Sequence, residues 1–356
     1  MSIAPRLKFV TVAGHAIGLG HLNRCLAVAE MAAAMGLVPD FVVFGDASAV
    51  TAVAAAGYSC RAFPLADLSD ATDERFHALG RTEAMLLDIV HPYLFDEEME
   101  TDVFVAARRV AKVLAAIDSL GEEAIAKNRP GALLDLLIVP YVVGPGDARR
   151  VADVGKRQLF GPEYALLSED YQGLPERVQS PAASRVLVTC GGSDPTSATL
   201  AVLDGLERSS SLLEVHVVVG PLFSASLREA VVDAARNSRH AVSLVAAPES
   251  LREEMLWCEV AVAASGLTKY ELAATGTPAL LFSIGSVHEA NNRPFTAMGT
   301  AVDIGIGPEP RRVAVELANL LSQQETRALL SAAGRRMVDG NGTRRLIAEI
   351  RKELAC

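Results

Sequence analysis

The sequence predicts an α/β protein of two domains, each built on a parallel sheet covered by helices. Short apolar, β-branched runs alternate with stretches of helical spacing along all 356 residues, and strands separated by helices form parallel sheets. The two halves open alike, on a strand, a glycine turn and a helix, near residues 7–35 and 185–206. Half of the residues are hydrophobic and only 5% are aromatic, which favours helices packed on strands over a β-sandwich.

Composition excludes several classes of function. The net charge of -10 and the lack of a Lys/Arg cluster argue against a nucleic-acid partner. No apolar run approaches the ~20 residues that a membrane-spanning helix needs, and the N-terminus lacks a signal-peptide pattern. The five cysteines are scattered and lack metal-ligand spacing, so we expect buried thiols in a reduced, cytoplasmic protein without a metal site.

In the first half, strand and helix signals alternate in order. The run at 110–117 fits a strand or a helix by periodicity alone. The other predicted elements are strands at 7–13, 39–45, 58–64, 85–90 and 133–139, and helices at 22–35, 47–56 and 95–107.

A polar, proline-containing passage at 161–183 predicts the domain linker. We therefore expect domains at 1–175 and 185–340, followed by a terminal helix at 341–356. Beyond the linker the predicted strands are 185–189, 214–219, 242–246, 260–263 and 278–284, and the predicted helices are 196–206, 227–235, 251–257, 267–274, 291–298, 313–321, 326–337 and 343–354.

The first glycine turn, GLGHLNR at 18–24, joins a buried strand to a helix. Glycines let a ligand approach the backbone, and a helix start offers unpaired N–H groups to an anion. His21 stands where the turn meets the helix and could exchange a proton there. Two other interpretations remain open: a strand-to-helix turn with an incidental histidine, and a dinucleotide fingerprint with Asp46 as the ribose ligand. Asn23 in the place of the third glycine argues against the fingerprint.

Glycine turns also follow strands of the second half, and the carboxyl ends of parallel strands are where such sheets bind ligands. The loop around Ser265 offers hydroxyl and N–H groups at a helix start, which suit a diphosphate. Glu271 could accept hydrogen bonds from two ribose hydroxyls, or it could be a surface glutamate favoured by the helix dipole. The residues expected to bind a nucleotide here are Gly191, Gly192, Ser193, Asp194, Ser265, Gly266, Leu267, Thr268 and Glu271.

Four stretches together resemble a known family: GLGHLNR, GPEYALL, LVTCGGSDP and ASGLTKYELAATGTPALL. In this order and spacing they resemble the UDP-sugar hydrolases of pseudaminic acid biosynthesis, a family that overlaps spore-coat polysaccharide proteins. The resemblance covers most of residues 7–305, and GPEYALL has no generic structural explanation. It implies the GT-B fold, with two Rossmann-like parallel-sheet domains facing across a cleft, and the removal of UDP from 2,4-diacetamido-2,4,6-trideoxy-altropyranose.

The resemblance assigns roles to individual residues. His21 matches the family's general base, and Arg24 matches an arginine that could pair with phosphate oxygens. Asn291 matches an asparagine near the nucleotide, while His288 stands where relatives often have glutamine. Gly20 and Asp88 complete the predicted set of substrate-binding residues.

The chain departs from the family pattern on the sugar side. Val90 replaces a tyrosine, with His91 and Tyr93 nearby, and Ser119 replaces the second of two aspartates. Tyr270 replaces a tryptophan before the glutamate. These changes leave the identity of the sugar open, and they leave Asp88 and His91 as rival bases.

The expected reaction is attack by water on the anomeric carbon while UDP departs. Neutral His21 would accept the proton of the water, and helix N-termini with Arg24 would stabilise the diphosphate, with no metal or cofactor. The expected partner is thus a small-molecule UDP-sugar. The alternatives are a GT-B glycosyltransferase that uses an acceptor hydroxyl, a non-catalytic nucleotide-sugar binding protein and, last, a dinucleotide oxidoreductase.

Overall fold

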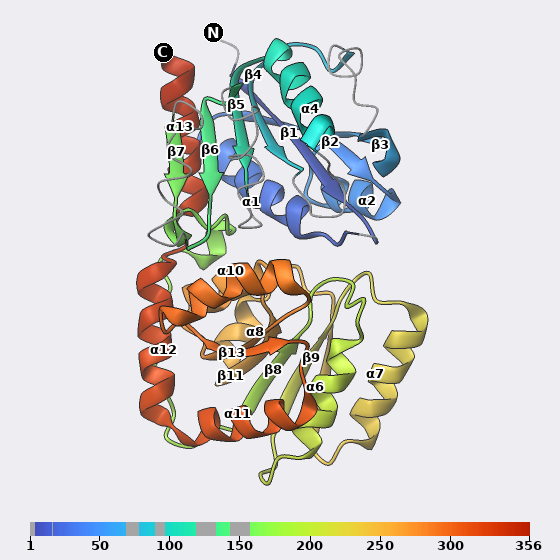
Figure 1. The fold of residues 1–356 in the computed structure, drawn as a ribbon, viewed down its shortest axis with the longest axis vertical. Helices are drawn as coiled ribbons and strands as arrows, with labels where there is room; N and C mark the ends of the chain where they lie inside the picture. Colours follow the sequence, from blue (N-terminus) through green and yellow to red (C-terminus); the bar gives the residue numbers. More distant parts are fainter. Residues whose placement is uncertain (1–3, 16, 69–77, 90–96, 119–132, 143–156) are drawn as a thin grey trace. The chain divides into compact units, whose positions relative to one another are not determined.

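The computed structural model describes residues 4–15, 17–68, 78–89, 97–118, 133–142 and 157–356, with the backbone alone at 97–102. The predicted strand at 85–90 and the predicted helix at 95–107 therefore extend beyond the described residues, at 90 and at 95–96. Val90, His91, Tyr93 and Ser119 lie outside the described residues. Contacts divide the chain into two compact units, coloured along the sequence in Figure 1. Unit 1 comprises Met1–Glu169 and Gly340–Cys356, and unit 2 comprises Asp170–Asp339.

The described residues of unit 1 form a sheet of seven parallel strands in the order β3-β2-β1-β4-β5-β6-β7. Residues 7–13 of β1 are all buried, because both faces of the sheet are covered. The strands are β1 (Arg6–Ala13), β2 (Val38–Gly45), β3 (Cys60–Phe63), β4 (Thr82–Asp88), β5 (Ala111–Ile117), β6 (Leu136–Val139) and β7 (Arg157–Phe160).

Helices cover both faces of this sheet (Figure 1). Phe104 of α4 belongs to the apolar cluster on one face, whereas Leu22 of α1 and Ile347 of α13 belong to the cluster on the other. The described elements are α1 (Gly20–Ala34), α2 (Ala47–Ala55), α4 (Glu97–Val110) and α13 (Gly342–Ala355), with short 3-10 turns at η1 (Leu65–Leu68) and η3 (Pro162–Tyr164). A third 3-10 turn, η4 (Glu169–Tyr171), lies where unit 1 passes into unit 2.

Residues 161–167 (GPEYALL) anchor the last helix of the chain within unit 1. A Cβ atom at Gly342 would lie 2.1 Å from the carbonyl oxygen of Ala165, so α13 begins directly against this segment. The hydroxyl of Thr343 donates to the carbonyl of Leu167 at 3.2 Å, and Arg345 donates to that of Glu163 at 2.7 Å. The motif therefore has a structural role that the sequence did not reveal.

Unit 2 contains six parallel strands in the order β10-β9-β8-β11-β12-β13. Its strands are β8 (Arg185–Thr189), β9 (Glu214–Val219), β10 (Ala241–Ala246), β11 (Val260–Ala264), β12 (Ala279–Ser283) and β13 (Val302–Ile306). Its helices are α6 (Ala198–Glu207), α7 (Ala225–Asn237), α8 (Arg252–Trp257), α9 (Thr268–Thr275), α10 (Ser286–Ala297), α11 (Pro310–Ser322) and α12 (Gln324–Met337).

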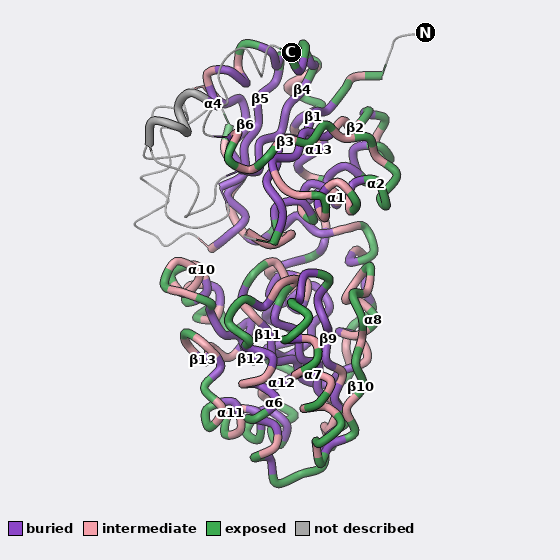
Figure 2. Tube along the Cα trace, turned by 90° about the vertical axis from the view of Figure 1, so that its right-hand side faces the viewer, coloured by how far each residue is buried: buried purple, intermediate pink, exposed green. Residues whose placement is uncertain are grey.

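Most differences from the predicted elements lie at the sheet edges. The segment at 110–117, which periodicity left undecided, is strand β5 because it pairs with β4 and β6. Two strands were not predicted, β7 and β13, and each forms one edge of its sheet. In Figure 2 the tube of the central strands is largely purple (buried), whereas β10, at the other edge of unit 2, is mostly pink and green. Buried strands have long apolar runs, which makes central strands easier to predict from the sequence than edge strands. In the part of the chain that the structure describes, no helix has the length and apolar character needed to span a bilayer.

Candidate functional site

The candidate site of unit 1 lies where the strand order reverses. The chain runs from β1 outward through β2 and β3, then continues at β4 on the other side of β1. Ligands of open parallel sheets bind outside the carboxyl ends of the strands at such a switch point. The glycine turn after β1 and Asp88, the last residue of β4, meet at this point.

The turn is closed by its own backbone. Gly14 and Gly18 exchange hydrogen bonds, with N···O distances of 3.1 and 2.7 Å, and Gly18 has φ of +79°, which glycine adopts without strain. Gly20 then begins α1, whose N-cap receives no side-chain hydrogen bond. This geometry carries His21 into the second position of the helix.

His21, Arg24 and Asp88 form one buried cluster. His21 Nδ1 lies 2.7 Å from Asp88 Oδ1, and Arg24 donates from Nη2 to the same oxygen at 2.8 Å. Arg24 also donates from Nε to Asp88 Oδ2 at 2.9 Å, so its guanidinium grips the carboxylate with two bonds. Asp88 is wholly buried and His21 is 6% exposed. The structure thus brings together three predicted residues that are up to 67 positions apart.

The charges of this cluster determine the tautomer of His21. Burial alone would raise the pKa of Asp88, but the positive charge of Arg24 and the bond with His21 outweigh it and lower the pKa to about 2. An ionised carboxylate can only accept hydrogen bonds, so Nδ1 of His21 carries the proton that it shares with Asp88. Arg24 Nη2, 3.0 Å from Nδ1, is also a donor and therefore bonds Asp88 rather than the ring. Nε2 is left as the basic nitrogen.

Asp46 caps a helix, which contradicts the dinucleotide interpretation of this turn. Its carboxylate accepts from the backbone N–H of Ser48 at 2.9 Å, at the start of α2, and from both the N–H and Nδ1 of His15 at 2.9 Å. A Cβ atom at Gly14 would lie 2.7 Å from this carboxylate. Burial would raise the pKa of Asp46, but the hydrogen bonds from Ser48 and His15 hold it well below its usual range. Its oxygens are therefore engaged within the protein.

The candidate site of unit 2 also lies at a switch point, between β8 and β11. After β8 the chain makes the Gly191–Gly192 turn, in which Gly191 has φ of +85°. Leu222 donates its N–H to the carbonyl of Gly192 at 3.0 Å, and a Cβ atom at Gly220 would lie 2.3 Å from that same oxygen. The loops after β8 and β9 therefore touch through glycine backbone. Ser193 follows in this turn, partly exposed.

Asp194 has a different local role from the other residues of this turn. Its two carboxylate oxygens accept from the N–H groups of Ala198 at 2.7 Å and Thr199 at 2.9 Å, which are the first residues of α6. A helix start capped by a protein carboxylate does not offer those N–H groups to a phosphate. Ligand binding by Asp194 stays a prediction, and the structure assigns it a capping function.

The start of α9 provides a better anion site. Its N-cap, Leu267, makes no side-chain cap, and the N–H groups of Gly266, Leu267 and Thr268 have no acceptor among the described residues. The hydroxyl of Ser265 lies 3.2 Å from that of Ser283, at the end of β12, which ties the loop to the sheet. Unpaired N–H groups at a helix start favour an anion, so this loop can hold a phosphate.

Glu271 lies in the first turn of α9 and is partly buried. Burial and the neighbouring carboxylate of Asp170 raise its pKa to about 7. A carboxyl group with this pKa changes its charge readily when a ligand offers it hydroxyl donors. This environment suits the predicted role of a ribose ligand.

The sequence did not single out Lys269, which the structure places beside two predicted residues of α10. Its Nζ donates to Asn291 Oδ1 at 3.1 Å, and burial lowers its pKa to about 7. Burial and the charge of Lys269 also lower the pKa of His288. A single lysine in a short helix is typical of a solvent-exposed face, and the sequence carries no signal of its burial.

The structure groups the predicted residues in two places, one in each unit. Among the described residues, no group of three or more His, Cys, Asp or Glu side chains is arranged to hold a metal ion. Cys190, beside the glycine turn, is buried, and burial raises the pKa of its thiol above the usual range. It therefore lacks the thiolate character of a nucleophile.

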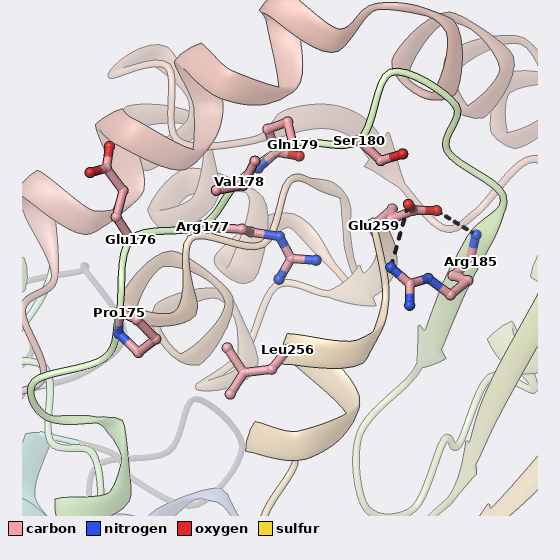
Figure 3. A pocket seen from close by; sticks show the side chains of 9 residues that line it. All are labelled: Pro175, Glu176, Arg177, Val178, Gln179, Ser180, Arg185, Leu256 and Glu259. Carbon is pink, nitrogen blue, oxygen red and sulfur yellow. Dashed lines mark hydrogen bonds and ion pairs between the residues drawn. The ribbon is translucent and has the colours of Figure 1, made fainter.

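A cavity of about 240 Å³ lies at the other end of the unit 2 strands (Figure 3). Arg185, which begins β8, and Glu259, which precedes β11, line it, so it adjoins the amino ends of the strands. Arg177 donates to the carbonyl of Met255 at 2.8 Å, and Glu259 accepts from the backbone of Arg185 at 3.0 Å. The cavity therefore lies at the sheet edge opposite to the one where parallel sheets bind ligands. The polar side chains that line it mainly form hydrogen bonds that hold the segment after η4 against the rest of unit 2.

Two parallel α/β sheets of seven and six strands, each with a switch point at its carboxyl edge, define this chain as a protein with the GT-B fold. MurG of Acinetobacter baumannii matches 98% of this chain and 100% of its own, with a TM-score of 0.66 and 14% identity. MnaA of S. aureus, in a structure with UDP, matches 98% of this chain and 97% of its own, with a TM-score of 0.61 and 16% identity.

At the level of sequence, no protein-family model matches the chain. The chain is similar to the spore coat polysaccharide biosynthesis protein SpsG of Bacillus subtilis (strain 168), with 26% identity over 209 residues. The match covers 57% of this chain and 61% of SpsG, so it spans less than two thirds of that relative.

Proposed function

We propose that this protein is a UDP-sugar hydrolase in which unit 2 binds the nucleotide and His21 of unit 1 activates the attacking water. The support comes from the two candidate sites, from the family resemblance of the four motifs, and from the likeness in fold to a protein solved with UDP. The likeness in sequence to a polysaccharide biosynthesis protein agrees with a substrate that carries a sugar.

The observation that carries the proposal is the buried bond between His21 and Asp88, 2.7 Å long. It directs the proton to Nδ1 and leaves Nε2 to accept a proton, which is the state that a general base needs. Arg24 keeps Asp88 ionised, so the acid orients the ring and does not compete for the proton. In this proposal Asp88 is a positioning residue rather than a ligand of the substrate.

The proposed reaction is a displacement at the anomeric carbon. The water oxygen bonds to that carbon, one water proton passes to Nε2 of His21, and the bond from the carbon to the diphosphate oxygen breaks. The electron pair of that bond leaves with UDP, whose added charge the N–H groups at the start of α9 stabilise. Glu271 holds the ribose hydroxyls, and His21 later returns its proton to solvent.

For the sugar we propose a 2,4-diacetamido-2,4,6-trideoxy hexose, the free form of which serves nonulosonate (pseudaminic acid) synthesis. This part rests on the resemblance of motifs, and the departures at Val90 and Ser119 fall on the sugar side. A panel of UDP-sugars with and without the two acetamido groups tests it: selective turnover of the diacetamido compound supports the assignment.

The direct test of the activity is the release of UDP from such a substrate without any acceptor. Steady release of UDP with an equal amount of free sugar supports a hydrolase. Release that starts only when an acceptor alcohol is added would identify a glycosyltransferase. Tight binding of the UDP-sugar without turnover in either case would identify a binding protein.

A further inference from the structure

Lys269 is a buried cation that the proposed reaction leaves without a role. It is 3% exposed, and no carboxylate among the described residues lies within 4.0 Å of its Nζ. Burying an ammonium group away from a counter-ion is costly, and lysines are rarely buried without a partner. Such an arrangement indicates that its charge matters for something that binds nearby.

The surroundings of Lys269 fix its ammonium group in place. Nζ donates to Asn291 Oδ1 at 3.1 Å and approaches the carbonyl oxygen of Asn291 at 3.5 Å. It also lies 5.1 Å from the ring centre of Tyr270 and 5.3 Å from that of Phe295, within cation–π range. The lysine therefore links α9 to α10 through Asn291 and Phe295.

This contact sets the orientation of the Asn291 amide. An ammonium group can only donate, so the amide oxygen must face Lys269 and the amide nitrogen must face the other way. In this orientation Asn291 can act through Nδ2 only as a donor, which is the kind of group that the acceptor oxygens of a phosphate or of a uracil ring need. Without Lys269 the amide could turn over and present an acceptor instead.

We propose that Lys269 is a positioning residue for nucleotide binding, which orients Asn291 and contributes a positive charge beside the anion site at the start of α9. This inference rests on the proposed function, because it assumes an anionic nucleotide at that site. It adds Lys269 to the proposed nucleotide-binding site. It also predicts that the affinity for the nucleotide depends on pH, because binding is coupled to the protonation of residues in the site.

The linkage involves two groups that act in opposite directions. Lys269 and Glu271 both have a pKa of about 7, lowered from 10.5 in the lysine and raised from 4.5 in the glutamate. A dianionic ligand favours protonated Lys269, which is populated below pH 7, whereas ribose hydroxyls favour ionised Glu271, which is populated above it. The groups that face Lys269 are Tyr270, Asn291, Phe295 and His288, and those that face Glu271 are Asp170, Tyr171 and Thr268.

The test compares the affinity for UDP of the parent protein, Lys269→Met and Glu271→Gln by calorimetry between pH 6 and 8.5. Methionine has a similar length and suits the apolar surroundings of Lys269, so the variant should fold, which thermal unfolding verifies. Arg236→Met, on the exposed face of α7, removes one positive charge from the same unit and serves as the control. The protonation of free UDP also changes with pH, but it changes equally for every protein. We therefore compare, at each pH, the ratio of the Kd of each variant to the Kd of the parent.

We expect Lys269→Met to weaken UDP about 10- to 100-fold at pH 6, the usual effect of losing a charged hydrogen bond, and progressively less as the pH rises above 7. Glu271→Gln should show the opposite trend, with its larger loss at high pH. Arg236→Met should change the Kd less than about 3-fold at every pH, the effect of one screened surface charge.

A double variant separates positioning from charge alone. If Lys269 acts by orienting Asn291, then Lys269→Met with Asn291→Ala should bind UDP within about 3-fold of the weaker single variant, because coupled residues are not additive. Equal UDP affinity of Lys269→Met and the parent at every pH would overturn the inference while the proposed function stands. A parent protein that does not bind UDP at all would overturn both.

Discussion

The two candidate sites satisfy their charges in different ways. In unit 1 the carboxylate of Asp88 is wholly buried, and both of its oxygens are bonded by His21 and Arg24. In unit 2 the N–H groups at the start of α9 have no acceptor among the described residues, and Lys269 and Glu271 both have a pKa of about 7. The first site is complete without a ligand, and the second is not.

This difference separates two tasks. A general base needs a fixed tautomer and orientation before the substrate arrives, which a permanent network of charged hydrogen bonds provides. A binding site gains affinity when the ligand itself supplies the missing partners and charges. Substitutions in unit 1 should therefore act on turnover and folding, and substitutions in unit 2 on affinity.

The largest expected effect is that of His21→Asn on turnover. Asparagine is polar and of similar reach, but it cannot take up a proton at neutral pH, and a general base typically contributes about 10²–10⁴ in rate. We expect the release of UDP from the UDP-sugar to slow by at least about two orders of magnitude, while the Kd for UDP is unchanged by calorimetry. Normal turnover by this variant would reject His21 as the base.

Asp88→Asn should reduce both turnover and stability. An asparagine leaves Arg24 without its charge partner and allows the wrong tautomer of His21, and breaking a buried ion pair costs about 3–5 kcal/mol. The pH dependence has a definite sign. Since the pKa of Asp88 lies near 2, below its ordinary 3.8, the ionised form stabilises the fold above about pH 4, and this contribution is lost as the pH falls from about 4 to 2.

Urea unfolding at several pH values measures this effect. The parent should lose more stability than Asp88→Asn between pH 4 and pH 2, so the two proteins should converge on the acid side. A constant difference in unfolding free energy across this range would show that Asp88 is not held ionised as described.

A smaller effect is expected from Gly342→Ala, which tests the structural role of residues 161–167. The new methyl group would lie 2.1 Å from the carbonyl oxygen of Ala165, so the start of α13 must shift. Overpacking of this kind typically costs about 1–3 kcal/mol, measurable by denaturant unfolding. Because α13 belongs to unit 1, the Kd for UDP should stay the same, and a large loss of UDP affinity would assign the motif to the binding site instead.

The sequence predicted the order of strands and helices better than it predicted the contacts between side chains in the two candidate sites. Long apolar runs predicted the central strands, whereas β7 (RQLF) and β13 (VDIGI) are short edge strands with polar residues or glycine, which give no strong periodicity. The two-domain α/β organisation followed from the repeated order of strands and helices, whereas the GT-B fold was implied by the resemblance of the motifs. Edge strands depend on pairing with a neighbour, which a single sequence does not display.

The roles within the sites depended on side chains that meet only in three dimensions. The glycine turn predicted His21 and Arg24, but the bond that orients His21 comes from Asp88 on another strand. Asp194 was predicted to bind a ligand, which stays a prediction, and the sequence did not reveal that it caps α6, since a carboxylate before a helix suits either role. Lys269 was missed because its burial depends on the packing of α10.

The most direct test of the central claim is the fate of oxygen during cleavage of the UDP-sugar in water enriched in a heavy oxygen isotope. Attack of water on the anomeric carbon, with the proton taken by His21, places the heavy oxygen in the free sugar and leaves UDP unlabelled in mass spectra. Phosphate oxygens do not exchange with water under these conditions, so the label in UDP is a reliable record. Heavy oxygen in the released UDP would mean attack on phosphorus, and it would contradict the account.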